Sequence, residues 1–409
     1  MQAPKNRMEV ANLKLDKCIF EELLRNSLSD DTIEILRIEH RCLSEKGLNF
    51  LSELYDVSII YKSKKNTKTE CSFDVIIKTE PIDNMSLFFL REQNLFTFEL
   101  TYTRDVLPRI ATLVNCQFGP HLFHGSLQPP ALIMENLKKK GYILKNRQKG
   151  LPFEHCRLVI ERLAKMHAGS VAVIEEEPEL VEFFKTGGMR KEANVEFLAL
   201  LTKSSLRQMS EQIQQWPYEW CASVAKKLVK LGTTMKERFS NVYDCDADEI
   251  RVLNHGDCWV NNMLFKENEE GQPVDLLMVD YQLTNYSSPA VDLLHFLYSC
   301  PECAVRCDKE DYFLQLYLDT LKETMEGIGC KRKPPTMEQL KAAMYKRRIY
   351  AVLVGLVFSL RMLADKEDVE DFVLVADAGE TKLDVFKNPD AVRITQKMLP
   401  AMDAKGYLD

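Results

Sequence analysis

The chain has 409 residues, which is enough for two or three compact units with their own hydrophobic cores. It carries 54 Lys and Arg against 61 Asp and Glu, a net charge of −7, which argues against binding nucleic acid or anionic membranes through a generally basic surface. Apolar residues make up 45% of the chain, with only 16 Gly and 16 Pro, which excludes disordered and collagen-like classes. We therefore expect an ordinary globular protein.

The N-terminus and the cysteines indicate a cytoplasmic protein. The first eighteen residues mix charged and polar side chains and lack the apolar centre of a signal peptide. The longest apolar run, 349–360, is shorter than the roughly 20 residues that span a bilayer, and it predicts a buried helix. Cys300 and Cys303 form one CxxC pair, for which a helix end and its loop is the favoured interpretation over zinc or redox chemistry.

Strand patterns dominate the first third of the chain. A polar turn is expected at 62–68 between two of the strands. After Pro81, the residues Phe98, Tyr102 and Val106 recur every four positions, which predicts a helix that ends near Pro108. The strands that the patterns predict cover residues 35–43, 51–61, 71–78 and 131–134.

Beyond that point the apolar period becomes helical. Residues 153–169 place apolar side chains on one face and end at Gly169, a residue suited to a left-handed cap. Further helices are predicted at 217–236 and 337–361, with short strands between them at 251–256, 261–265 and 274–280. The predicted fold class is α+β, a two-lobe fold with a strand-rich N-terminal lobe (1–134) and a larger, mainly helical C-terminal lobe (135–409).

The strongest chemical signal lies in the short strand-rich segment of the C-terminal lobe. His255, Asp257 and Asn262 fit the pattern HxDxxxxN, and Asp280 follows Asp257 by 23 residues at the end of a predicted strand. Phosphoryl transfer needs an Asp that accepts the proton of the incoming hydroxyl, and an Asn with a second Asp that hold Mg²⁺ against the nucleotide phosphates. Oxygen ligands suit that metal. The pattern therefore favours phosphoryl transfer.

A lysine and a glutamate in the N-terminal lobe support this interpretation. Lys78 ends a predicted strand, and Glu99 lies on the following predicted helix, 21 residues later. A strand Lys paired with a helix Glu holds the nucleotide phosphates in kinase-like enzymes. Taken alone, each residue is better explained as solvated or exposed, but together with the motif, in the correct order, the functional pair becomes the preferred interpretation.

These segments resemble a known family, the ecdysteroid kinase-like proteins of insects, a branch of the kinase-like superfamily that contains choline kinases and aminoglycoside phosphotransferases. The resemblance covers most of the chain. The pattern HGDxWxxNxxF followed by the triplet Asp280-Tyr281-Gln282 is specific to this branch, because protein kinases carry Gly where Gln282 stands. The segments that carry the resemblance are HGDCWVNNMLF (255–265), VDYQ (279–282), SSPAVDLL (287–294), LAKMHA (163–168), LIMENL (132–137) and 96–102.

The resemblance implies a role for each matched residue. Asp257 would be the catalytic base, and Asn262 and Asp280 would hold magnesium. Lys78 would contact the phosphates of ATP and Glu99 would pair with it. The resemblance thus implies ATP and Mg²⁺ as the cofactors.

It also implies the remaining contacts of the nucleotide. The hinge would be 134–137, where the backbone of Glu135 and Leu137 would face the adenine ring. The segment 47–52 resembles the loop that covers the phosphates, with Ser52 as the expected side-chain contact.

The chain departs from the family pattern at three places. Asn136 stands where the family usually has Asp, Tyr281 replaces the commoner Phe, and the loop 47–52 has one glycine. None of these changes removes a proton acceptor or a metal ligand. Because a loop poor in glycine would bind a nucleotide less well, a pseudokinase stays open as an alternative.

Four further residues near the motif have mainly structural interpretations. His255 is expected to order the catalytic loop by hydrogen bonds, and His167 to be a core or capping residue rather than a ligand. The resemblance suggests that Asp292 braces the catalytic loop, while its alternative is an acid at a helix N-terminus. Trp259 either walls an acceptor pocket or packs the segment.

The predicted enzyme is an ATP- and Mg²⁺-dependent kinase that phosphorylates a hydroxyl of a small molecule. The resemblance implies a lipophilic acceptor, an ecdysteroid or a dietary or xenobiotic alcohol, and hence a role in detoxification. The alternatives are a catalytically weak pseudokinase that binds a nucleotide or ligand, and a choline-kinase-like amino alcohol kinase. A protein kinase is disfavoured because no APE-type segment follows Asp280. The expected partner is the small-molecule acceptor, with no nucleic acid, membrane or protein partner.

Overall fold

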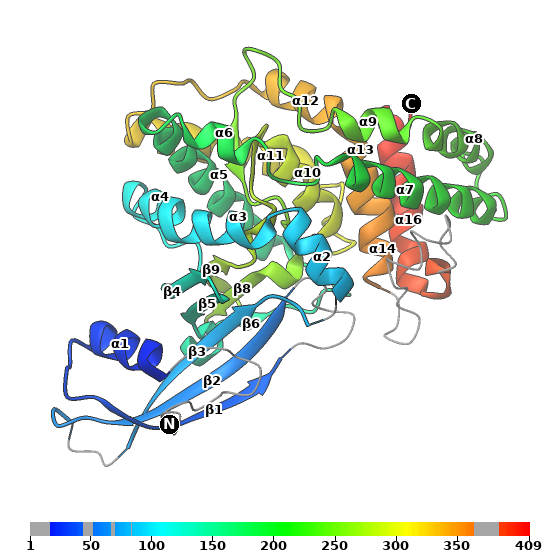
Figure 1. The fold of residues 1–409 in the computed structure, drawn as a ribbon. Coiled ribbons are helices and arrows are strands. Elements are labelled where there is room, and N and C mark those ends of the chain that lie inside the picture. The colour runs from blue at the N-terminus through cyan, green and yellow to red at the C-terminus, as the bar shows by residue number, and fades with distance from the viewer. Residues whose placement is uncertain (1–16, 44–51, 67–69, 83, 364–383) are drawn as a thin grey trace. The chain divides into compact units, whose positions relative to one another are not determined.

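The computed structural model describes residues 17–43, 52–66, 70–82, 84–363 and 384–409. The fold is α+β, as predicted: an antiparallel, strand-rich N-terminal part precedes a larger, mainly helical part (Figure 1).

The chain divides into two compact units. Unit 1 comprises 1–105 and 119–143, and unit 2 comprises 106–118 and 144–409. Unit 2 therefore takes one short segment from within the N-terminal part of the sequence. The division of roles between 1–134 and 135–409 stays a prediction.

Unit 1 is built on a five-stranded antiparallel sheet with the order β1-β2-β3-β5-β4. The sequence predicts four of these strands, while β4 and the helices α1 and α2 were missed. The elements of this unit are α1 (Lys17–Leu28), β1 (Glu34–Cys42), β2 (Glu53–Lys62), β3 (Cys71–Thr79), α2 (Asn84–Glu92), α3 (Leu95–Thr101), β4 (Leu122–Leu127) and β5 (Pro130–Glu135).

The core of unit 1 lies on one face of this sheet and includes α1. Phe20 of α1 is buried in one cluster with residues of the strands, among them Val75 and Ile77 of β3. Because successive side chains of a strand point to opposite faces, Lys78 belongs to the face opposite Ile77. The alternation of β3 thus separates the apolar core from the one lysine that the sequence selects for function.

The helical path after α3 continues where the sequence predicts a break. A π-helical turn (Tyr102–Val106) leads into α4 (Leu107–Leu113), and Pro108 lies in the first turn of α4. A proline is tolerated there because the first turn of a helix has no internal acceptor for its missing N–H. The prediction that the helix ends near Pro108 is therefore wrong.

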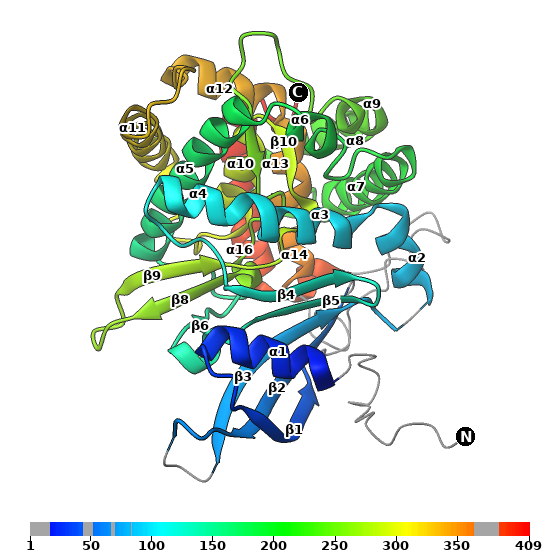
Figure 2. The same cartoon turned by 60° about the vertical axis from the view of Figure 1, so that its left-hand side comes forward.

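Unit 2 is mainly helical. Its helix α5 packs along α11, as Figure 2 shows, and α7 packs along α8. The short strand β6 (Ile143–Leu144) lies where the chain enters this unit. The helices are α5 (Phe153–Glu176), α6 (Leu180–Phe184), α7 (Glu192–Ile213), α8 (Cys221–Gly232), α9 (Met235–Ser240), α10 (Ala290–Ser299), α11 (Glu310–Gly327), α12 (Met337–Lys346), α13 (Arg348–Val352), α14 (Ser359–Arg361) and α16 (Pro389–Ala404).

Helix α5 runs seven residues beyond its predicted end, to Glu176. Gly169 is inside the helix, and a Cβ atom added to it would lie 2.6 Å from Ile110 Cγ2 of α4. The glycine therefore permits close packing of α4 against α5, and the prediction that it caps the helix is wrong.

The apolar run 349–360 is buried, as predicted, although the helical region 337–361 is not one helix. It divides into α12, α13, a π-helical segment (Leu353–Phe358) and α14. In the described ranges, no helix combines the length and the apolar character that crossing a membrane requires.

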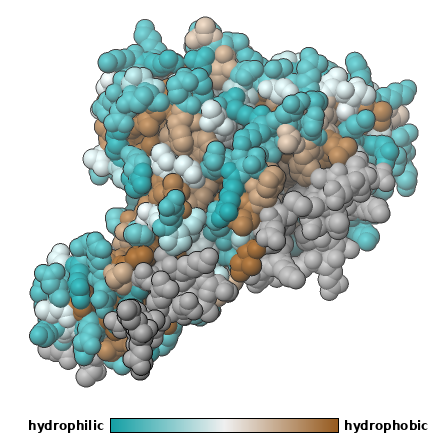
Figure 3. Space-filling model, viewed as in Figure 1, coloured by the Kyte–Doolittle hydropathy of each residue, from teal (hydrophilic) through white to brown (hydrophobic). Residues whose placement is uncertain are grey.

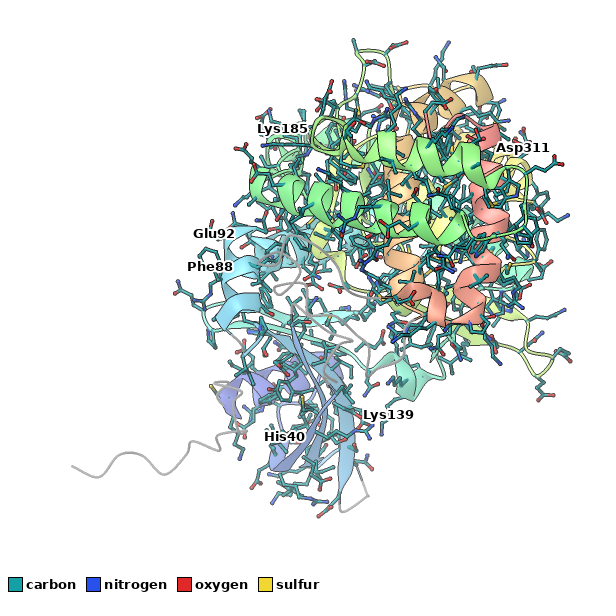
Figure 4. All side chains as sticks on the ribbon, turned by 90° about the vertical axis from the view of Figure 1, so that its right-hand side faces the viewer. His40, Phe88, Glu92, Lys139, Lys185 and Asp311 are labelled. Carbon is teal, nitrogen blue, oxygen red and sulfur yellow. The ribbon has the colours of Figure 1, made fainter. Side chains whose placement is uncertain are left out.

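Hydrophilic side chains dominate the face of unit 2 drawn in Figure 3, and the labelled Lys185 and Asp311 project outward in Figure 4.

In the described part of the chain, two small sheets lie among these helices and carry the predicted motif; one has two strands, and the other has three, of which β6 is the first. The strand β7 (Val252–Asn254) pairs with β10 (Asn285–Ser287), and β8 (Met263–Glu267) pairs with β9 (Pro273–Met278). The three strands predicted in this segment are thus confirmed, although β7 is shorter than predicted, β8 begins two residues later, and β9 runs from Pro273 to Met278.

Candidate active site

Lys78 and Glu99 form an ion pair inside unit 1. Lys78 lies on β3, between β2 and β5, and its Nζ atom is 2.6 Å from Oε2 of Glu99 on α3. The two side chains are 4% and 2% exposed. The structure therefore brings together the two residues that the sequence separates by 21 positions.

Burial of this ion pair carries a desolvation cost. Removing two charges from water costs several kcal/mol per ion, and their attraction offsets this cost only with good geometry. Apolar residues of similar volume would stabilise a core as well or better. A buried pair at this place is therefore more readily explained by a role in binding than by a role in folding.

The other residues predicted to contact the nucleotide also belong to unit 1. Ser52 is buried directly before β2. Glu135 ends β5 and forms an ion pair with Lys140. Leu137 is buried and begins a 3₁₀ turn, where its N–H has no partner within the turn. Residues 47–51 of the predicted phosphate loop lie outside the described residues.

Asn136 has a local explanation for its departure from the family pattern. The side chain is 3% exposed, and its Nδ2 donates to Oδ1 of Asp56, on β2, at 2.8 Å. An aspartate at this position would bring a second carboxylate against Asp56 instead of a donor. The amide therefore fits this chain better than the residue that is usual in the family.

The backbone and side chain of Asn262 hold the segment around Asp257 in unit 2. Asn262 ends the 3₁₀ turn Val260–Asn262, and its Nδ2 donates to Oδ2 of Asp257 at 2.9 Å and to the Asp257 carbonyl at 3.1 Å. The Asn262 carbonyl accepts from Val279 N at 3.0 Å. These hydrogen bonds connect the loop after β7 to the end of β9.

Asn262 and Asp280 have the donor atoms that a magnesium ion requires. The two hydrogen bonds of Asn262 use its amide nitrogen, which leaves Oδ1 as the atom suited to a cation. Asp280 adds a carboxylate, and hard divalent cations prefer such oxygen ligands. The residues that are present therefore fit Mg²⁺.

Asp280 has an unusual backbone conformation. Its φ of 69° and ψ of 61° lie in the left-handed region, which costs a non-glycine residue about 1–2 kcal/mol. Gln282 Nε2 donates to Asp280 Oδ2 at 3.4 Å, and Tyr281 OH donates to the Phe118 carbonyl at 3.1 Å. The hydroxyl that distinguishes Tyr281 from the commoner Phe thus has a partner.

His255 orders the loop that carries Asp257, as the sequence predicts. Its Nδ1 accepts from Asp257 N at 3.3 Å, so its Nε2 donates to the Val279 carbonyl at 3.0 Å. Burial lowers the pKa of this imidazole, which therefore stays neutral. Gly256 next to it has a φ of +84°, and an added Cβ would lie 2.1 Å from the Leu283 carbonyl oxygen. Only glycine fits this position.

Asp292 holds the backbone of the loop that follows β7. It lies in the first turn of α10, is fully buried, and accepts from the backbone N–H groups of His255 at 2.6 Å and Gly256 at 2.8 Å. His167 Nε2 lies 3.0 Å from the same carboxylate, and its Nδ1 lies 2.8 Å from Tyr317 OH. Burial acts to raise the pKa of Asp292, but the hydrogen bonds with His167 and the Gly256 N–H hold it below its ordinary value.

The structure adds one residue to this group that sequence reasoning missed. His295 Nε2 lies 3.9 Å from Oδ1 of Asp257. The spacing in the sequence could have indicated this residue, because His295 follows Asp292 by three residues on α10, which places both on one side of the helix. Cys300 follows the end of α10, as expected, and its Sγ donates to the Cys258 carbonyl.

The fold and the two groups of polar residues are those of the kinase-like class, in which a strand lysine, a helix glutamate and an Asp-Asn-Asp set recur in this order. A family model described as the ecdysteroid kinase-like family matches 46–330, more than half of the chain. The chain belongs to that family, and the resemblance seen in its motifs is confirmed. No curated protein matches the sequence.

Proposed function

We propose that the protein is an ATP- and Mg²⁺-dependent phosphotransferase that acts in the cytoplasm on a hydroxyl of a small lipophilic molecule, an ecdysteroid or a dietary or xenobiotic alcohol. The observation that carries this proposal is the contact between Asn262 and Asp257. One amide holds the predicted base through its nitrogen and keeps an oxygen for a cation. Family membership supports a small-molecule acceptor.

Asp257 is the base in this proposal. Its side chain is 23% exposed, so an acceptor can reach it from solvent. The hydrogen bond from Asn262 orients the carboxylate, and a positioned base accelerates such a step about 10²- to 10⁴-fold. Asp257 accepts the proton of the hydroxyl as its oxygen bonds to the γ-phosphorus, and ADP leaves with the electron pair of the broken P–O bond.

Asn262 and Asp280 hold the metal in this proposal. When bound, Mg²⁺ neutralises charge on the nucleotide phosphates. Both side chains are oriented before binding in this proposal, since Asn262 donates to the Asp257 carbonyl and Asp280 Oδ2 accepts from Gln282. Substitution of either ligand should raise the magnesium concentration needed for activity.

Lys78 contacts the α- and β-phosphates in this proposal, and Glu99 orients it. Burial keeps the ammonium group in one place, so little reorganisation is needed when a phosphate arrives. Ser52 would contact the phosphates, and the backbone of Glu135 and Leu137 would contact the adenine ring. The Leu137 N–H at the start of its turn is suited to donate to that ring.

The direct test combines purified full-length protein, ATP and Mg²⁺ with a panel of ecdysteroids, plant alcohols and choline, and detects added phosphate by mass spectrometry. We expect phosphate on a neutral lipophilic alcohol and none with Asp257→Asn. Phosphate on choline alone would replace the acceptor class, and binding of ATP without any transfer or hydrolysis would favour the pseudokinase.

The neighbours Asn261 and Asn262 provide a matched control. Asn262→Ala should abolish transfer at low magnesium, whereas Asn261→Ala should retain it, because the hydrogen bonds to Asp257 come from Asn262. Equal losses in both variants would contradict the assignment of the metal ligand.

A further inference from the structure

His295 occupies a distinctive place beside the predicted base. It lies on α10, one turn after Asp292, and its side chain is 8% exposed. Asp292 holds the loop backbone at His255 and Gly256, while His295 faces the Asp257 carboxylate. One helix therefore both braces the loop and places a ring nitrogen beside its reactive group.

The two oxygens of Asp257 have different surroundings. Oδ2 accepts a hydrogen bond of 2.9 Å from Asn262, whereas Oδ1 lies 3.9 Å from His295 Nε2. The second distance is too long for a direct hydrogen bond. A single oxygen atom at about 2.8 Å from both atoms fits such a separation. The geometry suits a hydroxyl that donates to Oδ1 and accepts from Nε2.

The charge of His295 fits this arrangement. Burial lowers its pKa to about 4, so the imidazole is neutral at pH 7. Tyr350 OH lies 3.5 Å from His295 Nδ1, and burial raises the pKa of this phenol well above its ordinary value, so it keeps its proton. Tyr350 OH lies equally near the Gly256 carbonyl oxygen, at 3.5 Å. When Tyr350 donates to Nδ1, the proton of the neutral ring is on Nε2, which faces Asp257, and the role proposed below requires this tautomer.

We propose that His295 is an acceptor-binding residue, whose Nε2–H donates a hydrogen bond to the attacking hydroxyl while Asp257 Oδ1 accepts the proton of that hydroxyl. The inference rests on the proposed function. The O–P bond forms at the γ-phosphorus, the bond from that phosphorus to the ADP oxygen breaks with its electron pair going to ADP, and the hydroxyl proton moves to Asp257. His295 keeps its own proton throughout.

This role has a consequence for the acceptor. The acceptor oxygen would face both the Asp257 carboxylate, which accepts a hydrogen bond, and the His295 N–H, which donates one. A hydroxyl satisfies both groups because it donates and accepts at once. A quaternary ammonium group or an ether oxygen satisfies only one of them. The site should therefore select the hydroxyl itself rather than a charge on the acceptor.

The test measures binding of ecdysone by calorimetry in the presence of Mg²⁺ and a nonhydrolysable ATP analogue. It is done in the Asp257→Asn background, with and without His295→Leu or His295→Gln. We expect ecdysone to bind about tenfold more weakly when His295 is leucine, as for the loss of one hydrogen bond. A glutamine amide reaches the position of Nε2, so the affinity of the glutamine variant should stay within about twofold. Nucleotide affinity should not change. His155→Gln, at a buried histidine beside Glu267, is the matched control and should bind ecdysone normally.

The outcomes separate the inference from the proposed function. If leucine and glutamine have no effect on ecdysone binding once the Asp257 carboxylate is gone, His295 acts only through Asp257 and the inference fails. If the unsubstituted protein transfers phosphate to no alcohol, the proposed function fails. Nitrogen NMR of histidine-labelled protein then still tests the arrangement, because a neutral ring protonated at Nε2 supports it and one protonated at Nδ1 overturns it.

Discussion

The candidate site residues of the two units differ in how their charges are balanced. In unit 1, Lys78 and Glu99 neutralise each other inside the protein, at 2.6 Å and almost without exposure. In unit 2, Asp257 and Asp280 accept hydrogen bonds from the neutral amides of Asn262 and Gln282. A neutral donor orients a carboxylate without cancelling its charge. In the proposed function, unit 1 thus presents a cation already held in place, while unit 2 keeps negative charge for a metal ion.

The largest expected effect comes from breaking the pair in unit 1. Lys78→Met removes the buried cation that Glu99 contacts at 2.6 Å, and we expect a loss of about 4 kcal/mol in the free energy of unfolding, measured in urea. The double variant Lys78→Met with Glu99→Leu should recover most of that stability. It should still fail to bind ATP. Recovery of ATP binding in the double variant would contradict the role of Lys78.

The second effect concerns the buried carboxylate of unit 2. Asp292→Asn removes the charge that accepts from two backbone N–H groups and faces His167, and we expect a loss of about 3 kcal/mol in stability together with slower phosphate transfer. Asp275→Asn is the control, because Asp275 pairs with Arg162 near the surface and is 34% exposed. That change should cost less than about 1 kcal/mol. Similar losses would show that Asp292 has no special role.

A pH dependence sharpens the contrast further. Burial lowers the pKa of His295 to about 4, and that of His255 in the same direction. Between about pH 6.5 and pH 4 the unfolded chain binds a proton at His295 that the folded chain does not, so this contribution to stability is complete above about pH 6.5 and decreases as the pH falls. We expect a loss of about 2 kcal/mol from pH 6.5 to pH 5, and a smaller one in His295→Gln. Equal slopes in both proteins would contradict a neutral buried His295.

The sequence predicts which polar residues come together better than it predicts where the helices end. Lys78 and Glu99 were selected because strand and helix periods placed them in the expected order, and the structure brings their side chains into contact. Their role toward a nucleotide stays a prediction. The ends of helices were harder to predict. Proline and glycine usually end helices, but neither does so here. Pro108 lies in the first turn of α4, where no N–H is needed, and Gly169 lies inside α5, where its missing side chain leaves room for Ile110.

His295 was missed for a related reason. Its partner Asp257 is 38 residues away in the sequence, and only the strand pair β7–β10 and the helix that follows bring the two together. Local patterns cannot predict such a contact. His167, by contrast, was predicted as a core histidine, and its contacts with Asp292 and Tyr317 agree with that interpretation.

The smallest effect tests whether unit 1 also depends on neutral donors. Asn136 donates to Asp56, which is 15% exposed and also paired with Arg41 at 2.8 Å. Asn136→Asp would restore the residue usual in the family but place two carboxylates together, and because Arg41 offsets part of the repulsion we expect a loss of only about 1 kcal/mol at pH 7. Adding Asp56→Asn should restore the stability, since an amide then faces the new carboxylate. If Asn136→Asp instead stabilises the protein, the family residue is compatible with this chain, and the amide of Asn136 has no advantage beside Asp56.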